Sequence, residues 1–149
     1  MVYIASDHAG FEIKVKTISF LRQNSIDFED MGPFEFNKND DYPDFAFKLG
    51  ETVVEKSSKG IIICGSGVGV CIACNKVKGV RAGYAESEEH AIESRTDDDT
   101  NILVLDAITF DPDIDFAIIT TWLNTVFSGE ERHVRRLKKI EEYENRGAA

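Results

Sequence analysis

The sequence lacks the features that mark membrane, exported and disulfide-stabilised proteins. It contains no run of about 20 apolar residues, the length that a membrane-spanning helix requires, and no basic segment followed by an apolar one near Met1. We therefore expect neither a membrane partner nor a signal peptide. Only three cysteines occur in 149 residues. This small, odd number argues against a disulfide framework and indicates a reducing, cytoplasmic location.

Positive charge is also scarce. The chain has 17 Lys and Arg against 27 Asp and Glu, a formal net charge of -10. Because binding nucleic acid requires a basic face, we expect no nucleic-acid partner. Basic residues gather in one run, RHVRRLKK at 132–139. Two interpretations stay open: a solvated helix end whose cations complement the helix dipole, or a local site for an anionic substrate.

What the chain does have is a regular alternation of apolar strand-like and amphipathic helical segments. We predict strands at 2–5, 26–30, 61–64, 80–84 and 101–105 and helices at 11–21, 44–55, 68–76, 87–95, 113–127 and 130–145. Apolar strands that alternate with helices are typical of a parallel sheet covered on both faces. No repeat or linker interrupts the pattern. We predict an α/β fold, a three-layer α/β/α single domain over residues 1–149 with a five-stranded parallel sheet.

Ligands bind to such sheets beyond the carboxyl ends of the strands, near a topological switch point. We expect four segments to meet there: Asp7 and His8 after the first strand, the loop with Tyr42, the loop after Cys64, and the segment before Asn101. Asp7 and His8 could hold a sugar hydroxyl or act as an acid–base pair. Alternatively, Asp7 accepts backbone N–H groups at the start of the next helix.

The most informative segment is GIIICGSGVGV at 60–70. An apolar strand ends in Cys64, and Gly65, Gly67 and Gly69 follow in alternation before a helix. The N–H groups of such a loop favour a thiolate, which lowers a cysteine pKa, and they can equally hold an oxyanion or a phosphate. A reactive sulfur beside such donors predicts an enzyme with Cys64 as a catalytic residue. The alternative is a buried, inert cysteine.

Other motifs fit less well. The third glycine comes one position too early for a dinucleotide fingerprint, and no lysine follows for an ATP loop. Cys71 and Cys74 form a C-x-x-C inside a predicted helix, where core packing is favoured over a zinc or thiol–disulfide site. The acidic run TDDDTN at 96–101 lacks the spacing of a calcium-binding EF-hand loop.

Taken in order, these motifs resemble the type B ribose-5-phosphate isomerase family, which includes the galactose-6-phosphate isomerase subunits. The resemblance covers nearly the whole chain. It is carried by SDHAGF at 6–11, DYP at 41–43, CGSGVG at 64–69 with Asn75–Lys76, GVRA at 79–82, DTN at 99–101, and Arg132–His133 with Arg136.

The resemblance implies a Rossmann-like domain that forms a homodimer or tetramer, with each active site shared between two subunits. It implies reversible interconversion of the sugar phosphates ribose 5-phosphate and ribulose 5-phosphate, in the pentose phosphate pathway. The reaction would pass through a cis-enediolate without a metal or an organic cofactor. Cys64 would remove the C2 proton, and Ser66 would contact the reacting carbonyl. Some relatives use a glutamate where this chain has Val70, so Cys64 is the only base that the resemblance supplies.

The resemblance also assigns the substrate contacts. Asp7, His8 and Tyr42 would hold the sugar and phosphate, and the backbone of the loop residues Gly65, Gly67, Val68 and Gly69 would bind the enediolate oxygens. Asn75 and Asp98 would also contact the substrate. Arg132 and Arg136 of the partner subunit would bind the phosphate.

Three positions depart from the family pattern. Asp97 stands in place of the histidine that opens the furanose ring, Asp98 in place of a substrate-binding asparagine, and Ile108 in place of an arginine. Three hypotheses stay open: Asp97 opens the ring because neighbouring carboxylates favour its protonated form, His8 does so instead, or the enzyme acts on open-chain or different sugar phosphates. The alternative functions are a related isomerase of galactose or allose 6-phosphate type and a non-catalytic phosphosugar-binding subunit. A thiol–disulfide oxidoreductase built on Cys71 and Cys74 is a more remote alternative.

Overall fold

The computed structural model describes residues 1–146. All five predicted strands and six predicted helices are present. They are β1 (Val2–Ser6), α1 (Phe11–Gln23), β2 (Phe28–Asp30), α2 (Tyr42–Glu55), β3 (Lys59–Cys64), α3 (Val68–Cys74), β4 (Ala82–Tyr84), α4 (Glu88–Thr96), β5 (Ile102–Asp106), α5 (Pro112–Asn124) and α6 (Glu131–Glu144). The sheet has the order β2-β1-β3-β5-β4, and all its pairings are parallel. The predicted five-stranded parallel sheet is confirmed.

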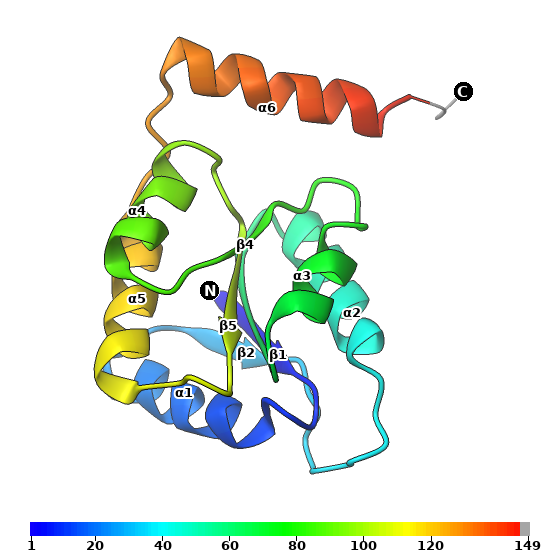
Figure 1. Ribbon diagram of the computed structural model, residues 1–149, viewed down its shortest axis with the longest axis vertical. Helices are drawn as coiled ribbons and strands as arrows, with labels where there is room; N and C mark the ends of the chain where they lie inside the picture. Colours follow the sequence, from blue (N-terminus) through cyan, green and yellow to red (C-terminus); the bar gives the residue numbers. More distant parts are fainter. Residues whose placement is uncertain (147–149) are drawn as a thin grey trace.

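Helices cover both faces of this sheet. On one face α2 and α3 bury apolar side chains such as Leu49 against Ile62 and its neighbours. On the other face α1, α4 and α5 bury Trp122, among others, against the alternate strand residues such as Ile63. Figure 1 shows α2 and α3 on one side of the sheet and α1, α4 and α5 on the other. Because the strands are buried on both faces, they read as continuous apolar runs in the sequence.

The switch point lies between β1 and β3. From β1 the chain passes to β2 on one side, and it then returns to place β3 on the other side. The register pairs Ser6, the last residue of β1, with Ile63, next to Cys64. The residues that follow β1 and the loop that follows β3 therefore start side by side at the carboxyl edge, where ligands bind in open α/β sheets.

One predicted part of the site lies at the opposite edge. Residues 97–101 lead into β5, whose first residue, Ile102, pairs with Gly60 and Ala82 near the starts of β3 and β4. Since the strands are parallel, this segment lies at the amino edge, whereas Cys64 lies at the carboxyl edge. The prediction that it meets the other three loops within one chain is wrong, because it precedes its strand and does not follow it.

Helix α6 crosses the same amino edge (Figure 1). Near its start, His133 is buried and its Nδ1 contacts the carbonyl oxygen of Thr96 at 3.3 Å. Near its end, Glu144 accepts a hydrogen bond from the backbone N–H of Gly79. Within residues 1–146, no helix is both long enough and apolar enough to cross a membrane.

Two helices differ in detail from the prediction. In α1, Lys14 is almost fully buried and Val15 is 52% exposed, although charged side chains usually face solvent and apolar ones the core. Lys14 reaches the carboxylate of Asp30 and the carbonyl oxygen of Pro33, which satisfies its charge inside the protein. Helix α2 starts at Tyr42, two residues earlier than predicted, because Pro43 occupies a first-turn position, where its missing N–H costs no hydrogen bond.

Candidate active site

A thiol and a carboxylate meet at the switch point. Cys64 Sγ donates a hydrogen bond to Asp7 Oδ2 at 3.0 Å, and Asp7 Oδ1 accepts the backbone N–H of Gly10 at 3.0 Å. Both side chains lie close to the protein interior, since Cys64 is 8% and Asp7 is 4% exposed. Asp7 therefore accepts a backbone N–H before α1, as one interpretation of the sequence proposed, and it also contacts the predicted base, which the sequence did not indicate.

The protonation state of Cys64 differs from the prediction. Burial has the largest effect, and together with the hydrogen bond to Asp7 and the charge of that carboxylate it raises the pKa of Cys64 to about 12. The N–H groups of Gly65 and Gly67 favour the thiolate, as predicted, but they are outweighed. At neutral pH Cys64 is therefore a protonated thiol with an acceptor for its proton already in contact.

The glycine loop is shaped by backbone conformation and close packing. Gly67 has φ +76, a left-handed conformation that side chains rarely adopt. A Cβ at Gly69 would lie 2.7 Å from the ring of Tyr42, so the absence of a side chain there lets this ring cover the loop. Ser66 and Val68 are exposed beside it, and Ser66 Oγ accepts the N–H of Val68 at 3.4 Å. The loop residues and Tyr42 thus lie together with Cys64, as predicted.

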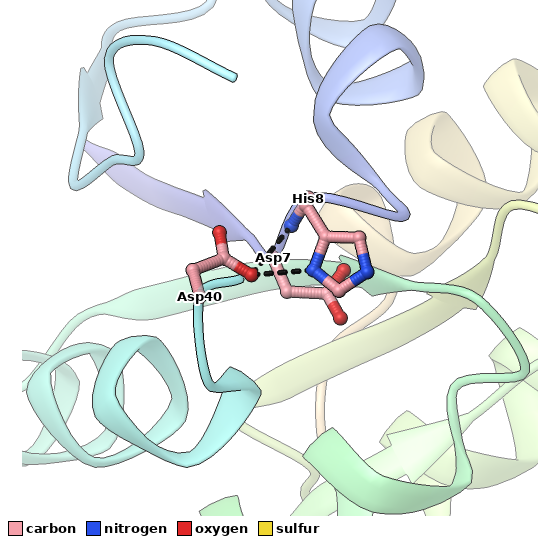
Figure 2. A group of neighbouring side chains, drawn as sticks. All are labelled: Asp7, His8 and Asp40. Carbon is pink, nitrogen blue, oxygen red and sulfur yellow. Dashed lines mark hydrogen bonds and ion pairs between the residues drawn. The ribbon is translucent and has the colours of Figure 1, made fainter. Parts of the chain in front are cut away.

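His8 is held by a residue that the sequence did not single out. Asp40 Oδ1 accepts the backbone N–H of His8 at 3.1 Å and contacts its ring Nδ1 at 2.5 Å. Figure 2 shows this double contact, with Asp7 beside the ring. The bond to Asp40 is the main cause that raises the pKa of His8 above its usual value, and the charge of Asp7 adds to it. A pair of aspartates just before the Tyr-Pro helix start was the available signal, but it predicts a helix cap equally well.

Asp7, His8 and Asp40 each offer a ligand atom within 4.8 Å of the others. Hydrogen bonds already account for this proximity, because Asp7 is bonded to Cys64 and Gly10 and Asp40 is bonded to His8. A metal would compete with each of these bonds, so the donor set gives no reason to place one here. That the reaction needs no metal or organic cofactor stays a prediction.

One residue of the acidic segment at the amino edge, Asp99, stabilises the fold. Asp99, with φ +45, bridges Arg95 at 2.7 Å and Arg81 at 2.9 Å. Arg95 is 7% exposed, so this carboxylate neutralises a buried guanidinium. The three adjacent aspartates do not form one uncompensated acidic group, because one of them is paired with two arginines.

The other predicted residues of this edge face solvent or α6. Asp97 Oδ1 lies 3.7 Å from Nδ1 of the buried His133. Asp97 and Asp98 both line a cavity of about 590 Å³ next to α6. On α6, Arg132 pairs with Glu130 and Arg136 is exposed. Within one chain, these four predicted site residues lie at the opposite edge of the sheet from Cys64.

Asn75 also lies away from the thiol, at the far end of α3. Its side chain makes two hydrogen bonds of 2.9 Å to the backbone of Ala82 and one of 3.0 Å to the carbonyl oxygen of Cys71. It thereby ties α3 to β4. These bonds give Asn75 a structural role. Its contact with substrate stays a prediction.

The C-x-x-C cysteines behave as packing residues. Cys74 is fully buried in the core, and Cys71 is half-buried with its Sγ 3.7 Å from the carbonyl oxygen of Ala82. Both are free thiols.

At the carboxyl edge, Ile108 is 76% exposed, so an apolar side chain occupies the position where the resemblance calls for an arginine.

Comparison with known proteins shows the family and the fold of the chain. A model of the family described as "Ribose/Galactose Isomerase" matches residues 2–140. The "Probable ribose-5-phosphate isomerase B" of Mycoplasma pneumoniae is 42% identical over 144 residues, 96% of this chain and 94% of that protein. The ribose-5-phosphate isomerase B structure from Clostridium thermocellum aligns with TM-score 0.92 at 38% identity over 97% of both chains. The Mycoplasma genitalium enzyme, solved with bound ribulose-5-phosphate, aligns with TM-score 0.91 at 42% identity over 97% of this chain and 95% of that one. The chain belongs to the ribose/galactose isomerase family.

Proposed function

We propose that this protein interconverts ribose 5-phosphate and ribulose 5-phosphate, with Cys64 as the base that moves the proton between C2 and C1. The observation that carries the proposal is the 3.0 Å hydrogen bond from Cys64 to Asp7 at the switch point of the sheet. The relatives named ribose-5-phosphate isomerase B, one of them solved with ribulose-5-phosphate, support the choice of substrate. Free cysteines are consistent with a cytoplasmic location, which we also propose.

The proton path begins at the thiol. Cys64 passes its proton to the Asp7 carboxylate, which leaves a thiolate and a carboxylic acid. The thiolate then removes the proton from C2 of the open-chain aldose, the hydroxyl proton of O2 moves to O1, and the resulting thiol returns its proton to C1. A base and donors for the developing oxyanion are the two requirements of this chemistry. The raised pKa of Cys64 makes the sulfur a strong base once it is deprotonated.

The glycine loop supplies the donors. We propose that N–H groups between Gly65 and Gly69 bind the oxygens of the cis-enediolate, with Ser66 near the carbonyl. The positive φ of Gly67 and the cover of Tyr42 over Gly69 hold this backbone in one conformation. Donors held in place before the reaction stabilise developing charge without reorganisation, which is a major source of catalysis.

We propose that a second copy of the chain completes the site. Asp97, Asp98, Arg132 and Arg136 lie at the amino edge, so they reach the thiol of Cys64 only from another subunit. A homodimer or tetramer would then place two exposed arginine side chains near the phosphate, where a guanidinium gives bidentate recognition. The phosphate would supply binding energy that positions the reacting carbons.

Mixing two impaired variants, assayed at a substrate concentration well below KM, tests this shared site. Cys64→Ala and Arg136→Ala subunits each damage one half. If the halves combine across an interface, unfolding and refolding a mixture restores one intact site in each mixed dimer, roughly a quarter of the activity of the unaltered protein. Activity that stays at the level of the separate variants contradicts a shared site.

The substrate is tested by direct assay. Purified protein is given ribose 5-phosphate, allose 6-phosphate and galactose 6-phosphate in parallel, and the ketose formed is measured. We expect the highest kcat/KM with the five-carbon sugar. A preference for a six-carbon phosphate would assign the chain to the other branch of the family. Binding without turnover of any of the three would indicate a non-catalytic subunit.

A further inference from the structure

The contact between Asp40 and His8 has no part in the proton path described above. Asp40 lies in the polar segment before α2, and its side chain is only 8% exposed. One of its oxygens accepts both the backbone N–H of His8 and the ring Nδ1. The segment is itself anchored, because the buried Lys14 donates to Asp30 at 2.6 Å and to the carbonyl oxygen of Pro33 at 2.7 Å. The segment is therefore tied down near its start by Lys14 and at its end by α2, which begins two residues after Asp40.

This contact settles which nitrogen of the ring is free. With Nδ1–H donated to a carboxylate, Nε2 points to the side of the ring away from Asp40 (Figure 2). Phe36 stands edge-on to the ring, with centroids 6.4 Å apart. The His8 side chain is 36% exposed, so a ligand can reach Nε2. Contacts to Asp40 and Phe36 therefore hold the backbone, Nδ1 and ring edge of His8. Its Nε2 is left free to donate or accept a hydrogen bond at the carboxyl edge.

The charges around the ring favour the imidazolium. Asp40 faces it from the segment before α2, and Asp7 faces it from the end of β1 and is in turn bonded to Cys64. The hydrogen bond to Asp40 raises the pKa of His8 most, partial desolvation opposes it, and Asp7 adds a smaller rise. A raised pKa means that the ring stays cationic to a higher pH than an ordinary histidine.

Among the segments that follow β1, β3 and β5, His8 is the only basic side chain, whereas the loop after β2 carries the exposed Lys38. The residues that follow β1, β3 and β5 read DHAG at 7–10, GSGVG at 65–69 and AIT at 107–109. Ile108 contributes an exposed apolar side chain there. An anionic ligand bound beside the glycine loop therefore has one cationic donor available from these three segments, and the charge of that donor depends on its neighbours.

We infer that Asp40 is a positioning residue that holds His8 as a fixed cationic donor, with Nε2–H directed at the anionic group of the sugar phosphate. The inference rests on the proposed function, which places the substrate at this edge. It adds Asp40 to the residues on which substrate binding depends, beside the Cys64–Asp7 pair. It also makes the affinity for phosphate depend on pH through the hydrogen-bonded pair of Asp40 and His8.

The test compares Asp40→Asn with Glu35→Gln. The asparagine oxygen can still accept Nδ1–H, so the ring keeps its orientation while the charge is lost. Glu35→Gln removes the same charge from an exposed position of the same segment. Asp40→Glu restores a carboxylate. In each protein, the pKa of His8 is measured by NMR titration of the ring, and the affinity for inorganic phosphate is measured at pH 7.5 and pH 5.5.

We expect Asp40→Asn to lower the pKa of His8 and to weaken phosphate binding about three- to tenfold at pH 7.5, the difference between a charged and a neutral donor. At pH 5.5, where the ring is protonated in both proteins, the difference should disappear, which a merely misfolded variant would not do. Glu35→Gln should match the unaltered protein, and Asp40→Glu should recover most of the affinity.

Two results would overturn the inference. An unchanged pKa of His8 in Asp40→Asn means that Asp40 does not hold the charge. A lowered pKa with unchanged phosphate affinity at pH 7.5 means that His8 does not face the anion. Neither readout requires turnover. A protein that shows both effects but isomerises no sugar phosphate would therefore contradict the proposed function and support the role of Asp40.

Discussion

The titratable side chains at the two edges of the sheet have different kinds of partners. At the carboxyl edge, the titratable groups are paired with one another: a thiol with Asp7 and an imidazole with Asp40. At the amino edge, Asp99 is committed to two arginines and stabilises the structure. Pairs that exchange a proton suit catalysis, and carboxylates that neutralise buried guanidinium groups suit stability. Under the proposed function, the chemistry belongs to the carboxyl edge, and the amino edge contributes recognition and support.

The largest effect on turnover is expected from Asp7→Asn, at the carboxyl edge. Asparagine cannot take the thiol proton, so kcat should fall about 100-fold or more, within the range of a lost general base. Steady-state kinetics measure it, with Glu29→Gln, an exposed charge removal on β2, as the control. Turnover within a few-fold of the unaltered protein would mean that Asp7 is only a structural cap.

The same variant should change the reactivity of Cys64 in the opposite direction. Burial, followed by the bond and charge of Asp7, raises the thiol pKa to about 12, so removal of this carboxylate lowers that pKa and increases the thiolate fraction at pH 8. Alkylation of Cys64 by iodoacetamide, followed by mass spectrometry of the peptide, should be faster in Asp7→Asn although turnover is slower. In the unaltered protein the rate should still be rising with pH above pH 9. Slower alkylation in the variant would contradict this account of the pair.

A smaller effect is expected from Arg136→Ala at the amino edge. If this arginine binds phosphate in a partner's site, KM should rise about tenfold while kcat changes little, the loss of a charge-assisted hydrogen bond. Arg135→Ala is the matched control, because Arg135 is the adjacent exposed arginine on α6. Equal effects of the two variants would point to general electrostatics and not to a specific contact.

The smallest effect on activity, and a measurable one on stability, is expected from Asp99→Asn. Asparagine tolerates the left-handed φ of this position, so the change removes charge and not conformation. Leaving Arg95 with one fewer ionic partner should lower the free energy of unfolding by about 1–3 kcal/mol, measured by urea denaturation. Asp98→Asn, at an exposed position, should change it by less than about 0.5 kcal/mol. Equal stability of both variants would show that the bridge contributes nothing.

The sequence predicted the strands and helices well because their signals are local. Apolar runs and helical spacing mark the elements, and Ser87 caps α4 by accepting the N–H of His90, a local signal of the same kind. The Cys64 loop was also predictable, since a strand-ending thiol and alternating glycines are visible in eleven consecutive residues at 60–70. The family motifs added the remaining candidates by their order along the chain.

The features that sequence reasoning missed depend on contacts between distant residues. Asp7 and Cys64 are 57 positions apart, and their contact reverses the expected direction of the cysteine pKa. Asp40 and His8 are 32 positions apart. The placement of residues 97–101 at the amino edge follows from the strand that comes after them. No periodicity reports such contacts, because they depend on strand order and on how loops pack.

The most direct test of Cys64 as the base follows the hydrogen at C2. Ribose 5-phosphate labelled with deuterium at C2 is incubated with the unaltered protein, Cys64→Ala and Cys71→Ala, and the label that appears in water and in ribulose 5-phosphate is measured over time. We predict label loss with the unaltered protein and with Cys71→Ala, and a rate about 100- to 10,000-fold lower with Cys64→Ala. Loss of label from C2 at a near-normal rate in Cys64→Ala would contradict the account.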